Sequence, residues 1–534
     1  MKQKNVVFIM ADQLRKDYVG CYGNPYVRTP NLDWIAQRGM RFDQCFVNNP
    51  ICMPNRMSLF TGRYPHNHGM WTNGLMLPHS LPTLADQLGN HGYHTCSIGK
   101  LHFEPTDCGP QAPMGSREDH RYWKQAGDDI DWYGPYWGFD HVELTVGHAT
   151  TPIAHYGKWF HQHGGTDDMA QAKKIGPFDC CGVTTMPEAL HDSLFVGERS
   201  AAYIQEHAKE ERPFFLLASF PDPHHPFNPP YETAMRYQDT PIKQPINEKD
   251  DLRTRPDHYR QQQKGIWHRA GLLKKTPDMT EQEKAQVEKN IAVISEFMDE
   301  KILEGLGLLT RGGSTPDKLE SDVVGERERD QRIRNTYAMV DLIDQGVGKI
   351  LEALRQTGTL EDTILVFTSD HGELMGDHGM WLKGPFFYDG LINVPLLISV
   401  PGMGSGSTKA LTSSVDVYPT LCQLLGVQIP RSCDGVSQVP ALAGGQPRNS
   451  CIFEYRNGYF ESDVNTMGYL DADYKFVQYQ TGECELTDRK NDLEENVNLA
   501  ADPANSALVE QYREKLLMAV LNTGNKYPDQ ISHA

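Results

Sequence analysis

The segment Asn5-Val-Val-Phe-Ile-Met10, followed directly by Ala11-Asp12-Gln13, decides the fold. Its apolar run, rich in β-branched residues, is typical of a strand that is buried on both faces of a sheet. In open α/β sheets, ligands bind outside the C-terminal ends of the parallel strands. The segment therefore predicts a buried strand that delivers Asp12 and Gln13 to an edge where a ligand would bind.

Strands and helices alternate along the chain after this segment. Apolar runs and capped amphipathic stretches predict strands at 40–47, 95–98, 213–220, 363–369 and 395–400, and helices at 29–39, 81–89, 194–208 and 332–354. This alternation predicts an α/β domain whose large, mixed and mostly parallel sheet is sandwiched by helices.

The C-terminal part of the chain follows a different pattern. Pro and Gly crowd residues 429–447, which indicates a boundary. Short strands at 451–455 and 474–479 and a helix near 506–520 predict a small antiparallel sheet with a helix against it. We therefore expect a large α/β domain over residues 1–430 and a smaller α+β subdomain over residues 431–534.

Two regions of the large domain, about 105–190 and about 230–330, interrupt the alternation and are expected to be insertions. The first is rich in Gly, Trp, Tyr and His, and its aromatic content argues against disorder. It suits a substrate-facing insertion and simple packing of loops equally well. Aromatic residues at 122–139 and histidines at 148–163 could line a sugar or aryl site. In the second, charge-rich helices over 279–309 are most simply a solvated face.

Composition excludes several classes of protein. The net charge of −19 over 534 residues, with no basic stretch to offset it, argues against nucleic-acid binding. No apolar run is long enough for a membrane span, and Val6 to Met10 is too short for a signal segment. The eleven scattered cysteines form no disulfide framework, so a cytoplasmic location is expected. Homo-oligomerisation stays open, with residues 527–534 as a candidate interface arm.

The segment Ile51-Cys-Met-Pro-Asn-Arg-Met-Ser-Leu-Phe-Thr-Gly-Arg63 is a candidate for chemistry. It follows the turn-forming Asn48-Asn49-Pro50 and predicts a short helix that ends at Gly62. Cys52 would lie at the N-terminus of that helix, where backbone N–H groups favour bound anions and lower the pKa of a thiol. For an isolated cysteine, a buried thiol beside a turn is the simpler interpretation.

Two expected strand ends carry pairs of potential metal ligands, Asp12-Gln13 and Asp370-His371. Taken singly, each pair is more simply a helix cap or a turn. Together they predict a divalent cation site, because charged residues at the ends of buried strands need compensation. Oxygen ligands with one imidazole suit Ca²⁺, Mg²⁺ or Mn²⁺, and the imidazole favours Mn²⁺ or Zn²⁺ somewhat.

Cationic side chains have the same placement. Lys100, His102 and His224 follow strand ends, and Lys383 lies in the loop after Asp370-His371. Arg56 and the helix N-terminus at Cys52 add to them. Together they predict a positive pocket that suits a tetrahedral oxyanion, with the histidines and Lys383 as candidate acids or bases for a leaving oxygen. Each alone is more simply a solvated or hydrogen-bonded side chain. The remaining histidines considered, namely His66, His68, His79, His91 and His225, are interpreted in that simpler way.

These residues carry a resemblance to a known family. Cys52-Met-Pro-Asn-Arg56 with Phe60-Thr-Gly-Arg63 resembles the sulfatase signature Cys-x-Pro-x-Arg followed by Thr-Gly-Arg. The family's other blocks are matched in order by Met10-Ala-Asp-Gln13, Gly99-Lys-Leu-His102, Pro223-His-His-Pro226, Ser369-Asp-His-Gly372, Lys383 and Asn491 to Ala500. The resemblance spans residue 4 to about 500, and it implies an alkaline-phosphatase-like fold.

The resemblance to type I sulfatases also implies a mechanism. In that family a maturation enzyme oxidises the signature cysteine, here Cys52, to formylglycine (3-oxoalanine). One hydroxyl of its hydrate attacks sulfur and releases the alcohol, and the other expels sulfate by reforming the aldehyde.

By matching position, the resemblance also assigns residue roles. The metal would be held by Asp12, Gln13, Asp370, His371 and the modified Cys52. Arg56 and Lys100 would steady the hydrate, and His102 would assist the step that reforms the aldehyde. His224 and Lys383 would contact the transferred group and the leaving oxygen, and Asn73 is a further candidate for substrate binding.

Three positions depart from the commonest family pattern. Asn55 stands where Ser, Thr or Ala is usual, Gln13 replaces a second Asp, and His371 stands where Asn is frequent. The last two resemble the choline-sulfatase and phosphonate monoester hydrolase branches of the alkaline phosphatase superfamily, and they leave Ca²⁺ and Mn²⁺ both open. Gly99-Lys-Leu-His102 keeps the sulfatase Lys and His.

The sequence therefore predicts an arylsulfatase-like hydrolase of small-molecule or saccharide sulfate monoesters, with one divalent metal, Ca²⁺ or alternatively Mn²⁺. A phosphonate monoester or phosphodiester hydrolase with the same site is the alternative within this chemistry. A non-catalytic metal- or anion-binding protein, or an enzyme that uses an unmodified thiol, belongs to another class.

Overall fold

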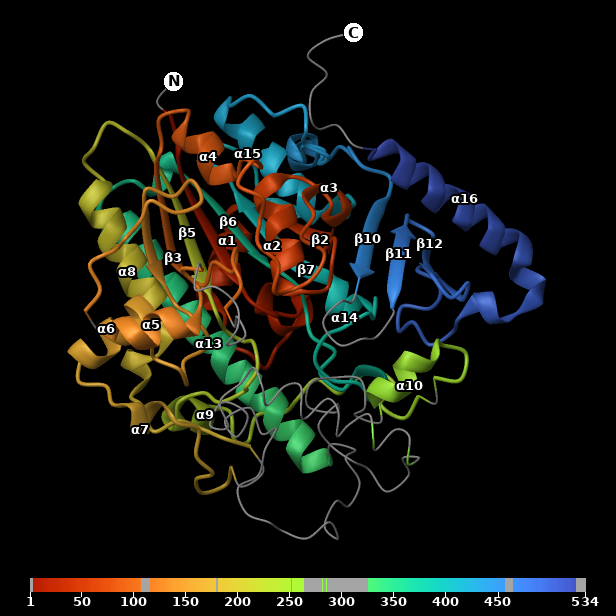
Figure 1. Cartoon of the computed structure of the whole chain (residues 1–534), viewed down its shortest axis with the longest axis horizontal. Coiled ribbons are helices and arrows are strands. Elements are labelled where there is room, and N and C mark those ends of the chain that lie inside the picture. Colours follow the sequence, from red (N-terminus) through yellow and green to blue (C-terminus); the bar gives the residue numbers. More distant parts are fainter. Residues whose placement is uncertain are drawn as a thin grey trace.

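The computed structural model describes residues 3–106, 116–127, 129–178, 181–250, 252–263, 325–456 and 464–524, with isolated positions 281 and 285. Within this part the chain forms a nine-stranded sheet and a separate four-stranded sheet (Figure 1). The expected charge-rich helices at 279–309 lie outside the described residues, apart from those two positions, and so does the candidate interface arm at 527–534. No helix of the described part has the length and apolarity that a membrane crossing needs.

The larger sheet is mixed and mostly parallel, as expected. Its strands follow the order β4 (His141–Leu144), β3 (His94–Gly99), β5 (Phe214–Phe220), β1 (Asn5–Ala11), β6 (Thr363–Ser369), β7 (Asn393–Ser399), β2 (Met40–Phe46) and β8 (Gly406–Thr408). The short β9 (Thr412–Ser413) also pairs with β2. The first five strands of this order are parallel, and β7 runs antiparallel to both of its neighbours.

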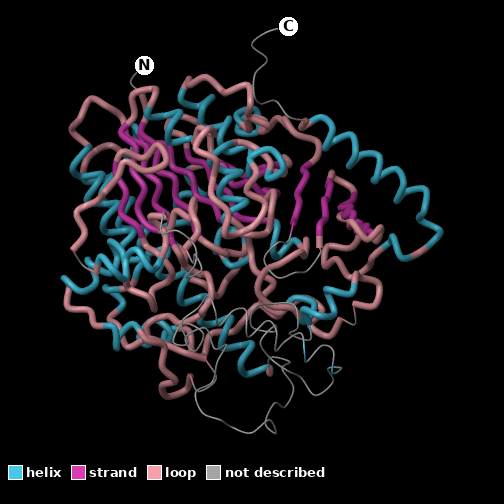
Figure 2. The backbone as a smooth tube through the Cα atoms, viewed as in Figure 1, coloured by secondary structure: helices cyan, strands magenta, loops and turns pink. Residues whose placement is uncertain are grey.

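Strand β1 separates two layers of apolar packing. Because successive side chains of a strand point to opposite faces, Val6, Phe8 and Met10 pack in one cluster and Val7 and Ile9 in the other. The first cluster includes α2 (Cys52–Thr61), α4 (Leu84–Gly89) and α15 (Val417–Leu425). The second includes α1 (Pro30–Arg38), α8 (Asp192–His207) and α13 (Glu326–Gln356). Figure 2 shows the strands of the larger sheet side by side.

The smaller sheet consists of four antiparallel strands in sequence order. They are β10 (Cys451–Arg456), β11 (Asn465–Leu470), β12 (Tyr474–Tyr479) and β13 (Cys484–Asp488). Helix α16 (Ser506–Asn522) packs Val509, Tyr512 and Leu516 against Phe476 and Leu486. The expected small antiparallel sheet with a helix is confirmed, whereas the division of the chain near residue 430 stays a prediction.

The region 105–190 is more regular than the sequence indicates. It contains α5 (His120–Ala126), α6 (Ala154–Gln162), α7 (Asp167–Ala170) and the edge strand β4 of the larger sheet. Strand β4 is only four residues long, which is too short to produce a recognisable period. The remaining short helices are α3 (Pro65–His68), α9 (Tyr231–Arg236), α10 (Asp257–Gln263) and α14 (Asp389–Ile392).

The register of the sheet aligns several strand ends. Ala11 lies opposite both Phe220 and Ser369, and Gly99 lies opposite Ser219 and Leu144. The residues that follow these positions therefore emerge at the same edge, although they are hundreds of positions apart in the sequence.

Gly99 is required by this alignment, and its replacement tests it. A Cβ atom at Gly99 would lie 1.9 Å from the Ser219 carbonyl oxygen, at a φ of +102°. We expect Gly99→Ala to destabilise the protein by roughly 2–5 kcal/mol, through left-handed backbone strain and a clash between two strands. Thermal or urea unfolding would measure the change.

Gly92→Ala is the matched control, because Gly92 also has a positive φ, +89°, but has open space around it. It should lose only about 1–2 kcal/mol. Equal losses in the two variants would contradict the close approach of β3 and β5 at Gly99.

Candidate active site

Helix α2 brings Cys52 to the aligned strand ends. The helix starts at Cys52, directly after an extended Ile51, and ends where Gly62 adopts a left-handed conformation, as predicted. The Asn73 side chain accepts the backbone N–H of Met53 at 3.1 Å, which satisfies one of the free donors of the first turn. Cys52 is 1% exposed, so its thiol faces the interior of the protein.

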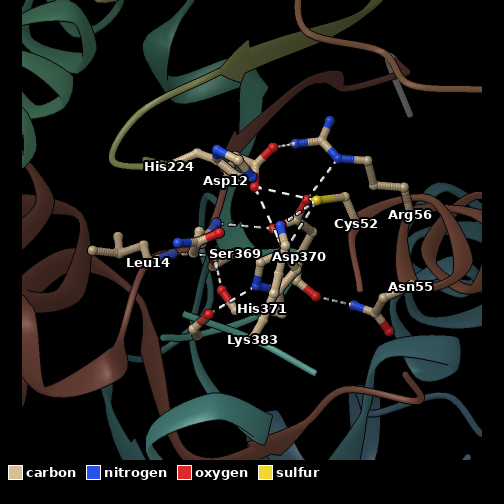
Figure 3. Close-up of polar contacts among 12 residues, drawn as sticks. Asp12, Leu14, Cys52, Asn55, Arg56, His224, Ser369, Asp370, His371 and Lys383 are labelled. Carbon is tan, nitrogen blue, oxygen red and sulfur yellow. Dashed lines mark hydrogen bonds and ion pairs between the residues drawn. The ribbon is translucent and has the colours of Figure 1, made fainter. Parts of the chain in front are cut away.

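Four potential metal ligands converge on this thiol. Ligand atoms of Asp12, Cys52, Asp370 and His371 all lie within 4.8 Å of one another, and all four residues are buried (Figure 3). The sulfur lies 3.6 Å from Asp12 Oδ1 and 3.2 Å from His371 Nε2. The two sequence pairs, Asp12-Gln13 and Asp370-His371, are thus neighbours in space.

Two further contacts orient ligand atoms toward this cluster. His371 donates its Nδ1–H to the Gly372 carbonyl at 2.8 Å, which leaves Nε2 with a free lone pair on the side of Cys52. The Gln13 side-chain amide nitrogen donates a hydrogen bond to Glu373 Oε2 at 2.5 Å. The amide oxygen Oε1 is buried and has no hydrogen-bond partner among the described residues. The Gln13 backbone N–H donates to Asp370 Oδ1 at 3.0 Å, so Gln13 lies next to the cluster, and a buried, unpartnered amide oxygen fits a cation ligand.

Three cationic side chains surround the cluster. Arg56 is fully buried and donates to Asp370 Oδ2 at 2.7 Å and to Asp12 Oδ2 at 3.4 Å. The Lys100 ammonium lies 2.5 Å from Asp12 Oδ2. The Lys383 ammonium lies 2.8 Å from the sulfur of Cys52 and 3.0 Å from His371 Nε2. The expected positive pocket therefore lies directly beside the carboxylates.

The electrostatics correct one expectation. Burial, followed by the nearby Asp12 carboxylate, raises the pKa of the Cys52 thiol above its usual value, although Lys383 and Lys100 act in the opposite direction. The prediction that the helix N-terminus lowers this pKa is wrong, because loss of solvation outweighs the helix dipole in a fully enclosed site. Burial would also raise the pKa of Asp12, but Lys100 and Arg56 hold it well below its usual value.

The two predicted histidines lie at the edge of the same cluster. Burial, with Lys100 and Arg56 next, holds the pKa of His102 well below its usual value, and burial and Lys383 do the same for His224. Both imidazoles are therefore neutral. His224 donates its Nδ1–H to the His225 carbonyl at 2.6 Å, and His102 Nδ1 is buried without a hydrogen-bond partner among the described residues.

Comparison with known proteins decides the family. A family model described as Sulfatase matches residues 4–427, which is most of the chain. The chain belongs to the sulfatase family. A second model, described as N-sulphoglucosamine sulphohydrolase, C-terminal, matches residues 376–521. The predictions of a sulfuric ester hydrolase, and of hydrolysis of sulfate monoesters, are therefore confirmed.

Individual relatives agree with this assignment. The choline-sulfatase of Rhizobium meliloti (strain 1021) is 26% identical over 93% of this chain and 83% of its own. A phosphonate monoester hydrolase of Agrobacterium radiobacter has a crystal structure with a TM-score of 0.71, at 25% identity over 98% of this chain and 96% of that chain. Another protein, whose structure is solved in complex with its substrate D-glucosamine-2-N,6-O-disulfate, has a TM-score of 0.70 to this chain. The two are 21% identical, over 99% of this chain and 100% of that chain.

The expected fold and the resemblance to the choline-sulfatase and phosphonate hydrolase branches of the alkaline phosphatase superfamily are confirmed. The individual roles of the site residues stay predictions.

The structure adds residues that sequence reasoning missed in this sulfatase. Glu373 is buried and accepts the backbone N–H groups of Met375 and Leu382 as well as the Gln13 amide, so it orients Gln13. His225, interpreted from sequence as an ordinary histidine, has its Nδ1 3.2 Å from the Gln13 amide nitrogen. Glu373 directly follows the Ser369-Asp-His-Gly372 block, and this position is the only sequence signal for its role.

Two other side chains form hydrogen bonds with the backbone of site residues. Asn55, the unusual residue of the signature, donates to the Asp370 carbonyl at 2.5 Å and to the Ser414 hydroxyl at 3.1 Å. Glu118 accepts the backbone N–H groups of His102, Phe103 and Glu104 and so fixes the loop that carries His102. Neither set of contacts has a local sequence signal, because the partners are backbone groups and, for Asn55, also a hydroxyl, in other parts of the chain.

Removal of Arg56 tests how the site is held. We expect Arg56→Ala to lower the free energy of unfolding by about 3–5 kcal/mol, because two buried carboxylates lose their counter-charge. Arg41→Ala is the control, since Arg41 pairs with Asp43 at 2.9 Å near the surface. It should change stability by at most about 1 kcal/mol. Chemical unfolding in metal-free buffer would measure both changes in free energy. Similar losses in the two variants would contradict the inference that Arg56 stabilises the two buried carboxylates.

Proposed function

We propose that this sulfatase hydrolyses its substrates with formylglycine at position 52 and one divalent metal held by Asp12, Gln13, Asp370 and His371. The observation that carries the proposal is the ring of ligand atoms within 4.8 Å around a cysteine whose thiol pKa is raised. A protonated thiol that faces two carboxylates is a poor nucleophile. The same surroundings suit a hydroxyl-bearing side chain that a cation and three basic residues stabilise.

The donor set supports a hard cation at this position. Asp12 and Asp370 contribute carboxylates, Gln13 contributes an amide oxygen with no other partner, and His371 presents Nε2. Three oxygen ligands favour Ca²⁺, and the imidazole keeps Mn²⁺ as the alternative. A divalent cation supplies Lewis-acid stabilisation of negative charge, in addition to that from the protein's own cations.

The side chains of this enzyme have distinct parts in the proposed reaction. Formylglycine hydrate supplies the hydroxyl that attacks sulfur. Arg56 fixes the two carboxylates, so they keep their orientation as charge moves. Lys100 and Lys383 stabilise negative charge on the sulfate oxygens, and the neutral His102 can accept a proton from the residue at position 52. His224 and Lys383 serve the transferred group and the leaving oxygen, and Asn73 holds the start of α2 beside them.

We propose a sulfate ester of a saccharide or another small alcohol as the substrate. The structural relative with glucosamine disulfate as its substrate supports this class, at the level of a shared fold. The phosphonate monoester hydrolase of similar structure keeps phosphonate monoesters and phosphodiesters as the second candidate. Turnover of para-nitrophenyl sulfate should exceed that of the corresponding phenylphosphonate ester in either Ca²⁺ or Mn²⁺. The reverse order would make the second candidate the main activity.

The proposal includes two statements about the cell. The nine cysteines of the described residues are all unbridged, which suits a cytoplasmic location. A formylglycine-generating maturation enzyme is the partner that position 52 requires. The oligomeric state stays a prediction.

Modification of position 52 can be tested with an internal control. Trypsin releases the peptide Phe42–Arg56, which contains both Cys45 and Cys52. In protein coexpressed with a maturation enzyme, fragment spectra should show an aldehyde at position 52 and an intact thiol at Cys45. Cys52→Ala should reduce kcat by at least about a thousandfold, because the nucleophile is lost. Full activity with an unmodified thiol at position 52 would contradict the mechanism.

Metal binding can be tested through Glu373, which orients Gln13. In Glu373→Gln an amide replaces the carboxylate, so the Gln13 amide is expected to turn its oxygen toward residue 373 and its NH₂ group toward the cation. We expect Ca²⁺ or Mn²⁺ to bind about 10–100-fold more weakly, as is typical when a ligand loses its supporting contact. Calorimetry and the metal content of the purified protein would measure this change.

Glu485→Gln is the matched control for that experiment. Glu485 is also buried, but it pairs with Arg255 in the smaller sheet. The control should keep the metal affinity of the wild type. Unchanged affinity in Glu373→Gln would argue against Gln13 as a ligand.

A further inference from the structure

The loop after strand β4 extends the active site in a way that the signature blocks do not indicate. Leu144, the last residue of β4, lies opposite Gly99, and the Thr145 N–H donates to the Gly99 carbonyl at 3.0 Å. Thr145 also pairs with Ala154, so the residues between them form a closed loop. Because Gly99 precedes Lys100, this loop starts beside the aligned strand ends. It carries His148.

His148 stacks on His224. The two ring centroids are 4.5 Å apart with an angle of 14° between the planes, and His224 stacks in turn on His225 at 4.0 Å. His225 contacts Gln13 at the other end. The three imidazoles therefore form a row that starts at the proposed metal ligand Gln13 and ends at His148. In this row of contacts His148 is the ring farthest from Gln13, the proposed metal ligand.

One nitrogen of the His148 ring makes no hydrogen bond with the described part of the chain. Its Nδ1 is buried and has no hydrogen-bond partner among the described residues. A buried polar atom without a partner costs free energy, and a ligand that forms a hydrogen bond with it would remove that cost. Burial and the nearby Lys100 lower the pKa of His148 to about 3. The ring is therefore neutral, and a neutral imidazole suits an uncharged hydroxyl or ether oxygen.

We propose that His148 is a substrate-binding residue that offers Nδ1 to an oxygen of the saccharide part of the sulfate ester, next to the leaving oxygen. This inference rests on the proposed function and adds a determinant of specificity for the alcohol. His224 contacts the transferred group, and His148, stacked against it, contacts the sugar that leaves. Sulfate esters without neighbouring oxygens would not use this contact.

Two variants separate hydrogen bonding from stacking. His148→Phe keeps an aromatic ring against His224 but has no ring nitrogen. His148→Asn loses the ring but places an amide group near the position of Nδ1. Metal-loaded, formylglycine-containing enzyme would be assayed with monosaccharide sulfates that differ in the position of the ester, and with para-nitrophenyl sulfate. Thermal unfolding would verify that both variants are folded.

We expect His148→Phe to lower kcat/KM for the best monosaccharide sulfate by about tenfold, the size of one net hydrogen bond, and to leave para-nitrophenyl sulfate within about twofold. His148→Asn should recover most of the loss on the saccharide. If His148→Phe keeps full activity on the saccharide, or loses equally on both substrates, the ring only packs against His224 and the inference is overturned. A wild-type enzyme that cleaves only the aryl ester would overturn it as well, whereas one that cleaves neither sulfate would overturn the proposed function too.

Discussion

The buried guanidinium of Arg56 is the interaction on which the arrangement of the active site depends. It donates to Asp12 and Asp370, which follow β1 and β6, and also to the Lys100 carbonyl after β3 and to the Ser219 hydroxyl in β5. One side chain of α2 thus binds groups from four neighbouring strands. A buried charge is tolerated only when it is paired and its donors are satisfied, so α2 has a single favourable position against the sheet. That position in turn decides where residue 52 lies.

The charges near the site have the opposite sign to those of the chain as a whole. The protein carries a net charge of −19, yet Arg56, Lys100 and Lys383 lie around two carboxylates and the residue at position 52. Surface charges are screened over about 8 Å in physiological salt, whereas groups inside a buried site interact at short range with little screening. An anionic ester is therefore attracted by the local cations, and the acidic surface has little influence once the ester has entered.

Local sequence patterns were sufficient for most of the fold and for the location of the site. β1 and β6 are apolar runs that Asp12 and Asp370 follow directly. Because parallel strands present their C-terminal ends at one edge, Asp12 and Asp370 could be expected to meet. The features that could not be predicted from the sequence depend on tertiary structure. Strand β4 is too short to have a period, the thiol pKa of Cys52 follows from burial, and Asn55, Glu118 and Glu373 act through distant backbone or amide groups. The stacking of His148 on His224 joins two loops that no spacing relates.

The burial of α2 bears on whether residue 52 can be modified before or after the protein folds. Every residue of this helix is buried, and Cys52 itself is 1% exposed, below strand ends and two lysines. The maturation enzyme proposed for position 52 would have to reach the Cys52 side chain, and the folded protein encloses that side chain. The proposed modification would therefore have to take place before α2 packs against the sheet. On the same proposal, a molecule that folds first would keep an unmodified thiol at position 52, and only unfolding would expose that thiol again.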